Sequence, residues 1–207
     1  MWTGYLILGI TYGFAAAVQP GPFQSYLISQ ALSHGWRRAL PAALAPLLSD
    51  GPIITLVLLV LSRVPPWLEI ALQTAGGIFL LYLAWGAYQS WKNYRAAAKP
   101  AAALQQTVLK AALVNLLNPA PYLAWSLVMG PLLLRGWREA PASGIALLIG
   151  FYVTMISGLA GIMLLFSAAS SLGPRVGRAL VGISVLALAG FGVYELWLGL
   201  SRAAGWG

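Results

Sequence analysis

The chain of 207 residues contains no cysteine and few charged side chains. Without cysteine it forms no disulfide, thiol redox centre or zinc–thiolate site, which excludes a thiol-redox carrier. Twelve Lys or Arg residues and four Asp or Glu residues make up 8% of the chain, whereas about a quarter of the residues of a typical soluble domain are charged. So few charges cannot cover the surface of a globule of this size, and the composition therefore argues against a soluble domain.

Apolar residues are abundant: 60% of the chain is hydrophobic, and the mean hydropathy is +0.81. A helix that spans a bilayer needs about 20 apolar residues. Six apolar stretches fit, with short loops between them, at about residues 5–32, 39–61, 67–91, 108–134, 142–167 and 176–200. Backbone groups in the bilayer core must be paired within their own segment, so these stretches are expected to be helices. We predict an all-α membrane protein of six transmembrane helices that forms a single domain, residues 1–207.

Two residue types support these boundaries and give an orientation. Tryptophans, which favour the headgroup level of a bilayer, lie near many expected helix ends, at positions 2, 36, 67, 91, 137 and 206. The loops after spans one, three and five hold most of the basic residues, namely Arg37, Arg38, Lys92, Arg95, Lys99, Lys110, Arg175 and Arg178. The other side holds Arg63, Arg135, Arg138 and Arg202. This bias predicts cytoplasmic odd-numbered loops and both termini outside, and scattered loop charge of this kind argues against nucleic-acid binding.

Two blocks of sequence repeat about 100 residues apart. Each has a Pro-x-Pro motif followed by Gly-Trp-Arg: Pro20-Gly21-Pro22 with residues 35–37, and Pro119-Ala120-Pro121 with residues 136–138. Three spans separate the starts of the two blocks, so the second copy is inverted relative to the first. We predict an inverted three-plus-three arrangement with repeat A at about 1–91, a linker at about 92–107 and repeat B at about 108–207. Inverted repeats with helices interrupted at matching positions are typical of secondary transporters.

The Pro-x-Pro motifs are expected to break spans one and four near the bilayer midplane. A proline inside a helix removes a hydrogen-bond donor and clashes with the preceding turn. Asn118 before Pro119 matches a helix N-cap followed by proline at the first helical position. The free amides of such half-helices attract anions, for which a carboxylate is suitable. The alternative is a pair of structural kinks satisfied by neighbouring helices.

Asp50 lies near the centre of the second stretch and is followed by Gly51-Pro52. A carboxylate at that depth costs several kcal/mol unless it is paired or protonated, so its default interpretation is functional. We predict that Asp50 binds substrate or carries a coupling proton; the alternative is an aspartate that caps a broken helix. Polar and aromatic residues expected to line the same cavity are Gln19, Gln24, Asn115, Asn118, Tyr122 and Trp125, with interhelical hydrogen bonding as their alternative role. Glycines 150, 158, 161, 182 and 190 are expected to permit close helix packing.

These motifs resemble the LysE-type amino-acid exporter family, which includes lysine/arginine and threonine/homoserine exporters. The matching pieces are Pro20-Gly21-Pro22, Ser49-Asp50-Gly51, Asn118-Pro119 and the basic linker between the third and fourth spans. The resemblance covers nearly the whole chain and implies a proton-driven secondary transporter in the cytoplasmic membrane that exports small amino acids or related solutes. It also places Pro20, Gly21, Pro22, Asp50, Asn118 and Pro119 at the translocation site. Many members have lysine after the Asn-Pro pair, where this chain has Ala120, so the substrate class does not carry over.

The prediction for function is therefore an exporter of small amino acids or related solutes, with protons and the lipid bilayer as further partners and a homodimer as one alternative for its oligomeric state. Its predicted translocation site comprises Pro20, Gly21, Pro22, Gln24, Asp50, Asn115, Asn118, Pro119, Pro121 and Tyr122, with Asp50 in proton coupling. No enzymatic activity, cofactor or metal is expected, because one histidine, His34, and four separated acids supply no catalytic or ligand cluster at one depth. The alternatives are a divalent-cation exporter, for which a single mid-span acid is weak support, a membrane-embedded enzyme and a structural subunit.

Overall fold

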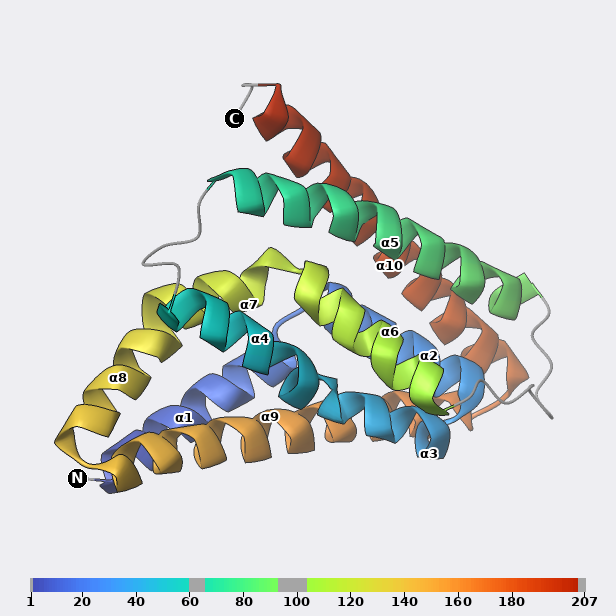
Figure 1. Cartoon of the computed structure of the whole chain (residues 1–207). Coiled ribbons are helices and arrows are strands. Elements are labelled where there is room, and N and C mark those ends of the chain that lie inside the picture. The colour runs from blue at the N-terminus through green and yellow to red at the C-terminus, as the bar shows by residue number, and fades with distance from the viewer. Residues whose placement is uncertain (1, 60–65, 93–103, 205–207) are drawn as a thin grey trace.

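The computed structural model describes residues 2–59, 66–92 and 104–204, and throughout these ranges the chain is helical apart from short connections. The elements in chain order are α1 (Trp2–Val18), α2 (Pro22–His34), α3 (Trp36–Ala39), the 3₁₀ turn η1 (Leu40–Leu44), α4 (Ala45–Leu59), α5 (Pro66–Lys92), α6 (Leu104–Leu117), α7 (Pro119–Ala124), the π-helical turn η2 (Trp125–Met129), α8 (Gly130–Glu139), α9 (Pro141–Ser170) and α10 (Pro174–Ala203) (Figure 1). The all-α prediction is confirmed for the described residues.

Several of these helices are long and apolar enough to cross a membrane. Within the described residues, four segments meet this criterion: Trp36–Leu58, Pro66–Lys92, Pro141–Ser170 and Pro174–Ala203. Helices α1 and α2 meet it together as a pair bent by 64° at a short break, which is the position of the first Pro-x-Pro motif. The chain is thus a multi-pass membrane protein. A sixth span, from α6 through α8, stays a prediction.

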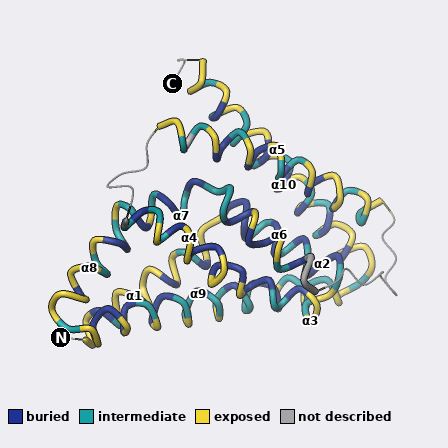
Figure 2. The backbone as a smooth tube through the Cα atoms, viewed as in Figure 1, coloured by how far each residue is buried: buried dark blue, intermediate teal, exposed yellow. Residues whose placement is uncertain are grey.

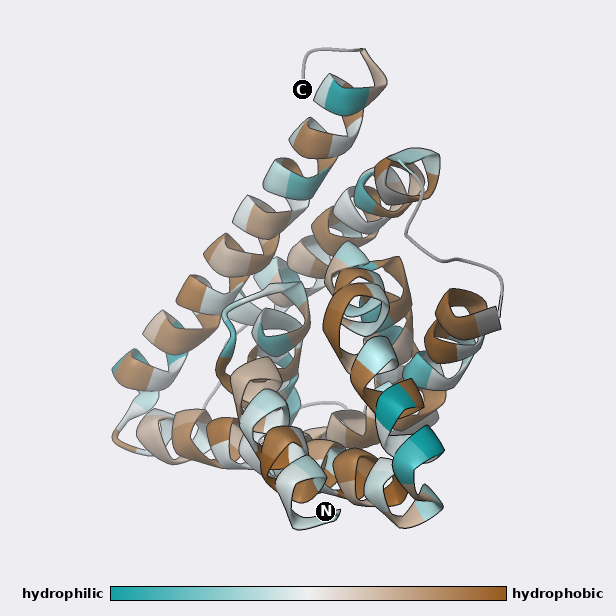
Figure 3. Ribbon diagram, turned by 90° about the vertical axis from the view of Figure 1, so that its left-hand side faces the viewer, coloured by the Kyte–Doolittle hydropathy of each residue, from teal (hydrophilic) through white to brown (hydrophobic). Residues whose placement is uncertain are grey.

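The outer faces of the long helices are hydrophobic and exposed (Figures 2 and 3). Leu165 on α9 and Leu186 on α10, for example, are 70% and 73% exposed. Monomeric soluble proteins rarely leave large contiguous apolar surfaces in contact with water. Lipid chains are the solvent that suits such faces, because the helices satisfy their own backbone polar groups.

Two long helix pairs flank the centre of the molecule. Helix α1 packs along α9, and α5 packs along α10, while α2, α4 and α6 lie between these pairs (Figure 1). The α1–α9 contact depends on glycine, because a Cβ atom on Gly9 or Gly13 would collide with the backbone of Leu147 or Phe151. Small residues let helix backbones approach closely where no hydrophobic effect separates helix from lipid.

Of the glycines expected to permit close packing, only some lie where another residue approaches closely. A Cβ atom on Gly150 would lie 2.6 Å from the Leu6 carbonyl oxygen, and one on Gly158 would lie 2.7 Å from the Ala17 Cβ. Gly182 approaches the Trp91 indole. The expectation is wrong for Gly161 and Gly190, since a Cβ atom on either would meet nothing within 4 Å.

Basic residues gather at one end of the helix bundle. Helices α2, α5 and α9 end there, and α6 and α10 begin there (Figure 1). The described basic residues at this end are Arg37, Arg38, Lys92, Lys110, Arg175 and Arg178, and those at the opposite end are Arg135, Arg138 and Arg202. Arg63, Arg95 and Lys99 lie outside the described residues. The charge bias thus persists in the folded chain, while its assignment to the cytoplasm stays a prediction.

Candidate functional site

A cavity of about 420 Å³ lies where the two helix breaks face each other. Predicted site residues that line it are Pro20, Gly21, Pro22, Gln24, Asp50, Asn115, Asn118 and Pro121. Pro119 and Tyr122 are buried but are not among its lining residues. The fold therefore brings together segments of the chain that are about 100 residues apart in the sequence.

The first break leaves the N-terminus of α2 without a side-chain cap. Gly21 occupies the N-cap position in extended conformation, and Pro22 is the first helical residue. The Gln24 side chain instead turns back, and its Nε2 donates to the carbonyl oxygen of Ala16 at 2.7 Å near the end of α1. The first amides of a helix have no intrahelical acceptor, so the α2 terminus presents donors at the edge of the cavity.

The second break is capped, as predicted. Asn118 is the N-cap of α7, and its Oδ1 accepts a hydrogen bond from the Ala120 amide at 3.1 Å, with Pro119 at the first helical position. The Tyr122 hydroxyl donates to the Leu116 carbonyl oxygen at 3.0 Å and so pairs a backbone group before the break. This contact fits the structural alternative for Tyr122, while its role in translocation stays a prediction.

Asp50 is 3% exposed and is held by side chains from two other helices. The Asn115 Nδ2 donates to its Oδ1 at 2.8 Å and also lies 2.8 Å from the Ser49 Oγ. The Tyr152 hydroxyl donates to the other carboxylate oxygen at 3.1 Å. Helix α4 continues past Asp50 and through Pro52, so Asp50 caps no helix end and that alternative is wrong.

The π-helical turn η2 places an aromatic side chain against the Asp50 carboxyl group. Trp125, the first residue of η2, is 1% exposed, lines the cavity and interacts through its side chain with Asp50. Its ring meets Phe151 edge-on, with ring centres 5.9 Å apart. Single π-helical turns are rare and frequently occur at functional sites.

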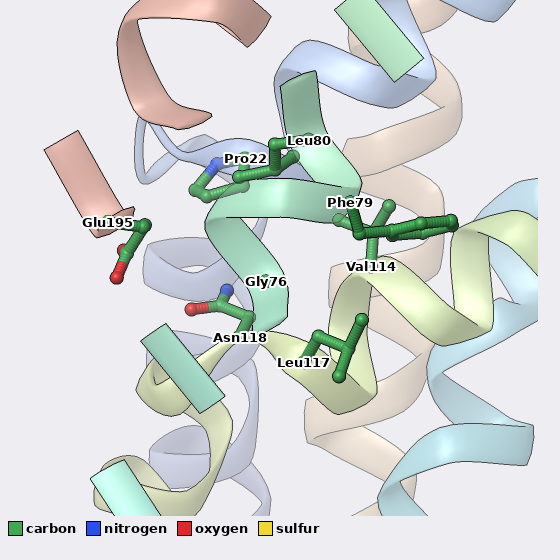
Figure 4. Close-up of a pocket in the computed structure, with 8 residues that line it drawn as sticks. All are labelled: Pro22, Gly76, Phe79, Leu80, Val114, Leu117, Asn118 and Glu195. Atoms are coloured by element: carbon green, nitrogen blue, oxygen red, sulfur yellow. The ribbon is translucent and has the colours of Figure 1, made fainter. Parts of the chain in front are cut away.

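Acidic groups dominate the charge of the cavity. Asp50 and Glu195 line it, whereas none of its described lining residues is Lys, Arg or His. Figure 4 shows Glu195 of α10 beside Pro22 and Asn118, around an adjoining pocket of about 10 Å³, which is room for one water molecule. Glu195 lies within the last apolar stretch, residues 176–200, and is not among the predicted site residues. An acid in an apolar stretch was the available signal.

Among the described residues, no group of three or more His, Cys, Asp and Glu side chains is arranged to hold a metal ion. The described structure therefore offers no observation that favours the divalent-cation alternative. His34, the single histidine of the chain, lines a different cavity.

Comparison with known proteins identifies the family. The family model for the LysE type translocator matches residues 14–198, a range that includes both helix breaks, Asp50 and Glu195. No curated protein and no solved structure matches the chain. The family match confirms the resemblance that the motifs indicated and agrees with the multi-pass helical fold. The chain therefore belongs to the LysE type translocator family.

Proposed function

We propose that this protein is a secondary transporter that exports small amino acids or related solutes across the cytoplasmic membrane in exchange for protons. The observation that carries the proposal is the meeting of both helix breaks and Asp50 in one cavity. A volume of about 420 Å³ falls within the usual range of small-molecule sites, roughly 300–1,000 Å³. Family membership supports a translocator rather than an enzyme.

The two ends of an amino acid match two regions of the cavity. Asp50 and Glu195 supply negative charge, and no lining residue supplies a fixed positive charge, so the substrate ammonium group binds on this side. The carboxylate binds at the N-terminus of α2, whose amides and helix dipole favour an anion. The α7 terminus is less suited to this task because Asn118 already accepts a hydrogen bond from the Ala120 amide.

Asp50 couples the movement of substrate to that of protons, because its partners among the described residues are neutral. Asn115 and Tyr152 donate hydrogen bonds to the carboxylate and the neutral Trp125 side chain interacts with it, but none of the three neutralises its charge. A charge at this depth requires compensation, and either a proton or the substrate ammonium group provides it. Because one excludes the other, outward movement of substrate is tied to inward movement of protons.

The inverted repeat supplies the conformational change. Helix α1 packs on α9, and the corresponding helix of the second repeat, α6, packs on α4, which is the counterpart of α9. Helices α5 and α10, the last of each repeat, pack on each other. These reciprocal pairings support a two-fold relation in the membrane plane, about which the two repeats move to expose the cavity to either side.

Efflux from proteoliposomes tests the proposal. Radiolabelled amino acids are loaded one at a time, and their release is measured with and without an imposed pH gradient. We expect gradient-dependent release of one amino-acid class by the wild-type protein and its loss in Asp50→Asn. Glu139→Gln, at the end of α8 and outside the cavity, is the matched control and retains efflux. Wild-type rates in Asp50→Asn, or the absence of gradient-dependent release of every amino acid, would overturn the proposal.

A further inference from the structure

A second cavity, of about 310 Å³, lies between α2, α5 and α6. It shares no lining residue with the central cavity, which adjoins the first turn of α2. The second cavity instead adjoins the last three turns of α2, from Tyr26 to His34, together with Ser90 near the end of α5 and Thr107 near the start of α6. It therefore lies toward the basic end of the bundle, where these helices end or begin (Figure 1).

The chemistry of this second cavity suits an anion. Lys110 lines it, no described Asp or Glu does, and the remaining polar lining consists of hydroxyl, amide, imidazole and indole groups. The Lys110 Nζ lies 5.8 Å from the centre of the Tyr82 ring, so the described contacts give this cation an aromatic neighbour but no acid. This charge is opposite to that of the central cavity, and the two cavities are therefore suited to different ligands.

Ser33 is an independent indication of a ligand. It is 2% exposed, it lines the cavity, and its hydroxyl has no hydrogen-bond partner. A buried hydroxyl without a partner loses its hydrogen bonds to water and gains none in return, and an anionic oxygen in the cavity relieves this penalty. Gln30, one turn earlier on α2, adds a side-chain amide to the same lining.

The rim of the cavity faces lipid. Tyr82 and Trp85 of α5 line it and are 59% and 61% exposed, and positions three apart share one face of a helix. Trp91, two turns further along α5, has the Arg178 guanidinium 5.0 Å from its ring centre. Aromatic residues beside basic ones mark the headgroup level of a bilayer, so the cavity opens at the depth of lipid phosphates.

We propose that the second cavity binds the headgroup of an anionic phospholipid. The lipid phosphate is placed between Lys110 and the Ser33 hydroxyl, and the acyl chains run along the exposed face of Tyr82 and Trp85. Basic pockets between transmembrane helices are chemically suited to such headgroups. The site holds the α2 end, the α5 end and the α6 start together at one membrane surface.

Binding of phosphatidylglycerol to the full-length protein tests the proposal. Native mass spectrometry from detergent, titrated with phosphatidylglycerol or phosphatidylcholine, counts bound lipids and gives their affinities. We expect one phosphatidylglycerol to bind at least tenfold more tightly than phosphatidylcholine. Lys110→Gln and Ser33→Ala should reduce this preference, whereas Lys110→Arg should keep it. Lys92→Gln removes a charge near the same surface but outside the cavity and should also keep it.

Three outcomes would overturn the lipid site. The first is the same preference for phosphatidylglycerol in Lys110→Gln as in Lys92→Gln. That result would show that the preference depends on general surface charge and not on the cavity. The second is loss of the preference in Lys110→Arg as severe as that in Lys110→Gln. The third is displacement of phosphatidylglycerol by millimolar glycerol phosphate, which would identify a soluble anion as the ligand. Ser33→Ala removes only one oxygen atom and keeps the test valid if the charge variants fold poorly.

Discussion

Single residues decide what the central cavity attracts. Asp50 receives hydrogen bonds from Asn115 at 2.8 Å and Tyr152 at 3.1 Å, so the orientation of its carboxylate is set by α6 and α9. Lipid and protein interior raise the energy of any charge that is not compensated. Donors that fix the carboxylate without neutralising it leave Asp50 able to bind a cationic group.

Loss of the Tyr152 hydroxyl should weaken transport without abolishing it. Tyr152→Phe removes one donor to Asp50 and leaves Asn115 in place. A hydrogen bond to a charged group contributes about 1.5–3 kcal/mol, and we expect at least a fivefold lower initial rate of amino-acid efflux. Tyr194→Phe is the control because Tyr194 lines the same cavity and makes no described hydrogen bond to Asp50. Equal rates for the two variants would contradict the positioning role of Tyr152.

At the scale of elements, the helix breaks are built differently from each other. The α7 start is capped by Asn118, whereas the α2 start has no side-chain cap and Gln24 ties it to the end of α1. A capped terminus has one donor fewer for a ligand. The two helix breaks therefore contribute unequal chemistry to the cavity.

Because α1 packs closely on α9, the effect of replacing a glycine of α9 on stability depends on where that glycine lies. In Gly150→Val the new side chain meets the Leu6 carbonyl at the α1 surface, whereas in Gly161→Val it meets open space. Overpacking typically destabilises by about 1–3 kcal/mol, so we expect Gly150→Val to unfold at lower temperature than Gly161→Val in detergent micelles. The change in helix propensity is the same in both variants. Equal unfolding temperatures for the two variants would contradict the close packing of α1 on α9.

At the scale of the whole molecule, the described residues form apolar outer faces, a basic end, an acidic central cavity and a cavity that contains Lys110. The acidic central cavity lies between the helix breaks, and the cavity that contains Lys110 lies toward the basic end. This separation would keep an anionic lipid headgroup, bound as proposed, away from the proposed site of the substrate ammonium group. Net charge +8 suits a protein whose basic end contacts anionic lipid.

Orientation in the membrane is open to direct measurement because the chain has no native cysteine. Leu172→Cys, in the turn between α9 and α10, and Ala204→Cys, after α10, place single thiols at exposed positions on opposite sides. The charge bias predicts that a membrane-impermeant maleimide labels Ala204→Cys in intact cells. Leu172→Cys should be labelled only after permeabilisation. The reverse pattern would place the basic end outside.

Local sequence patterns were enough to predict an all-α membrane protein and the positions of its two helix breaks. Long apolar stretches admit only helices in a bilayer, and the Pro-x-Pro pairs mark the two helix breaks, whereas the single Pro52 lies inside α4 without interrupting it. The Asn118 cap followed from a two-residue pattern, since capping is local. These features depend on residues that are close together in the chain, so the sequence is enough to predict them.

Tertiary structure alone decided which distant residues meet. Tyr152 and Asp50 are separated by 102 positions, and no periodicity in either helix shows that they pair. Glu195 enters the cavity because α10 packs against α2, while Tyr122 turns to a backbone carbonyl. Gly150 and Gly161 have the same local sequence character but face a helix and open space. Side chains in similar local sequences therefore have different roles, because the contacts of each depend on which helix packs against it.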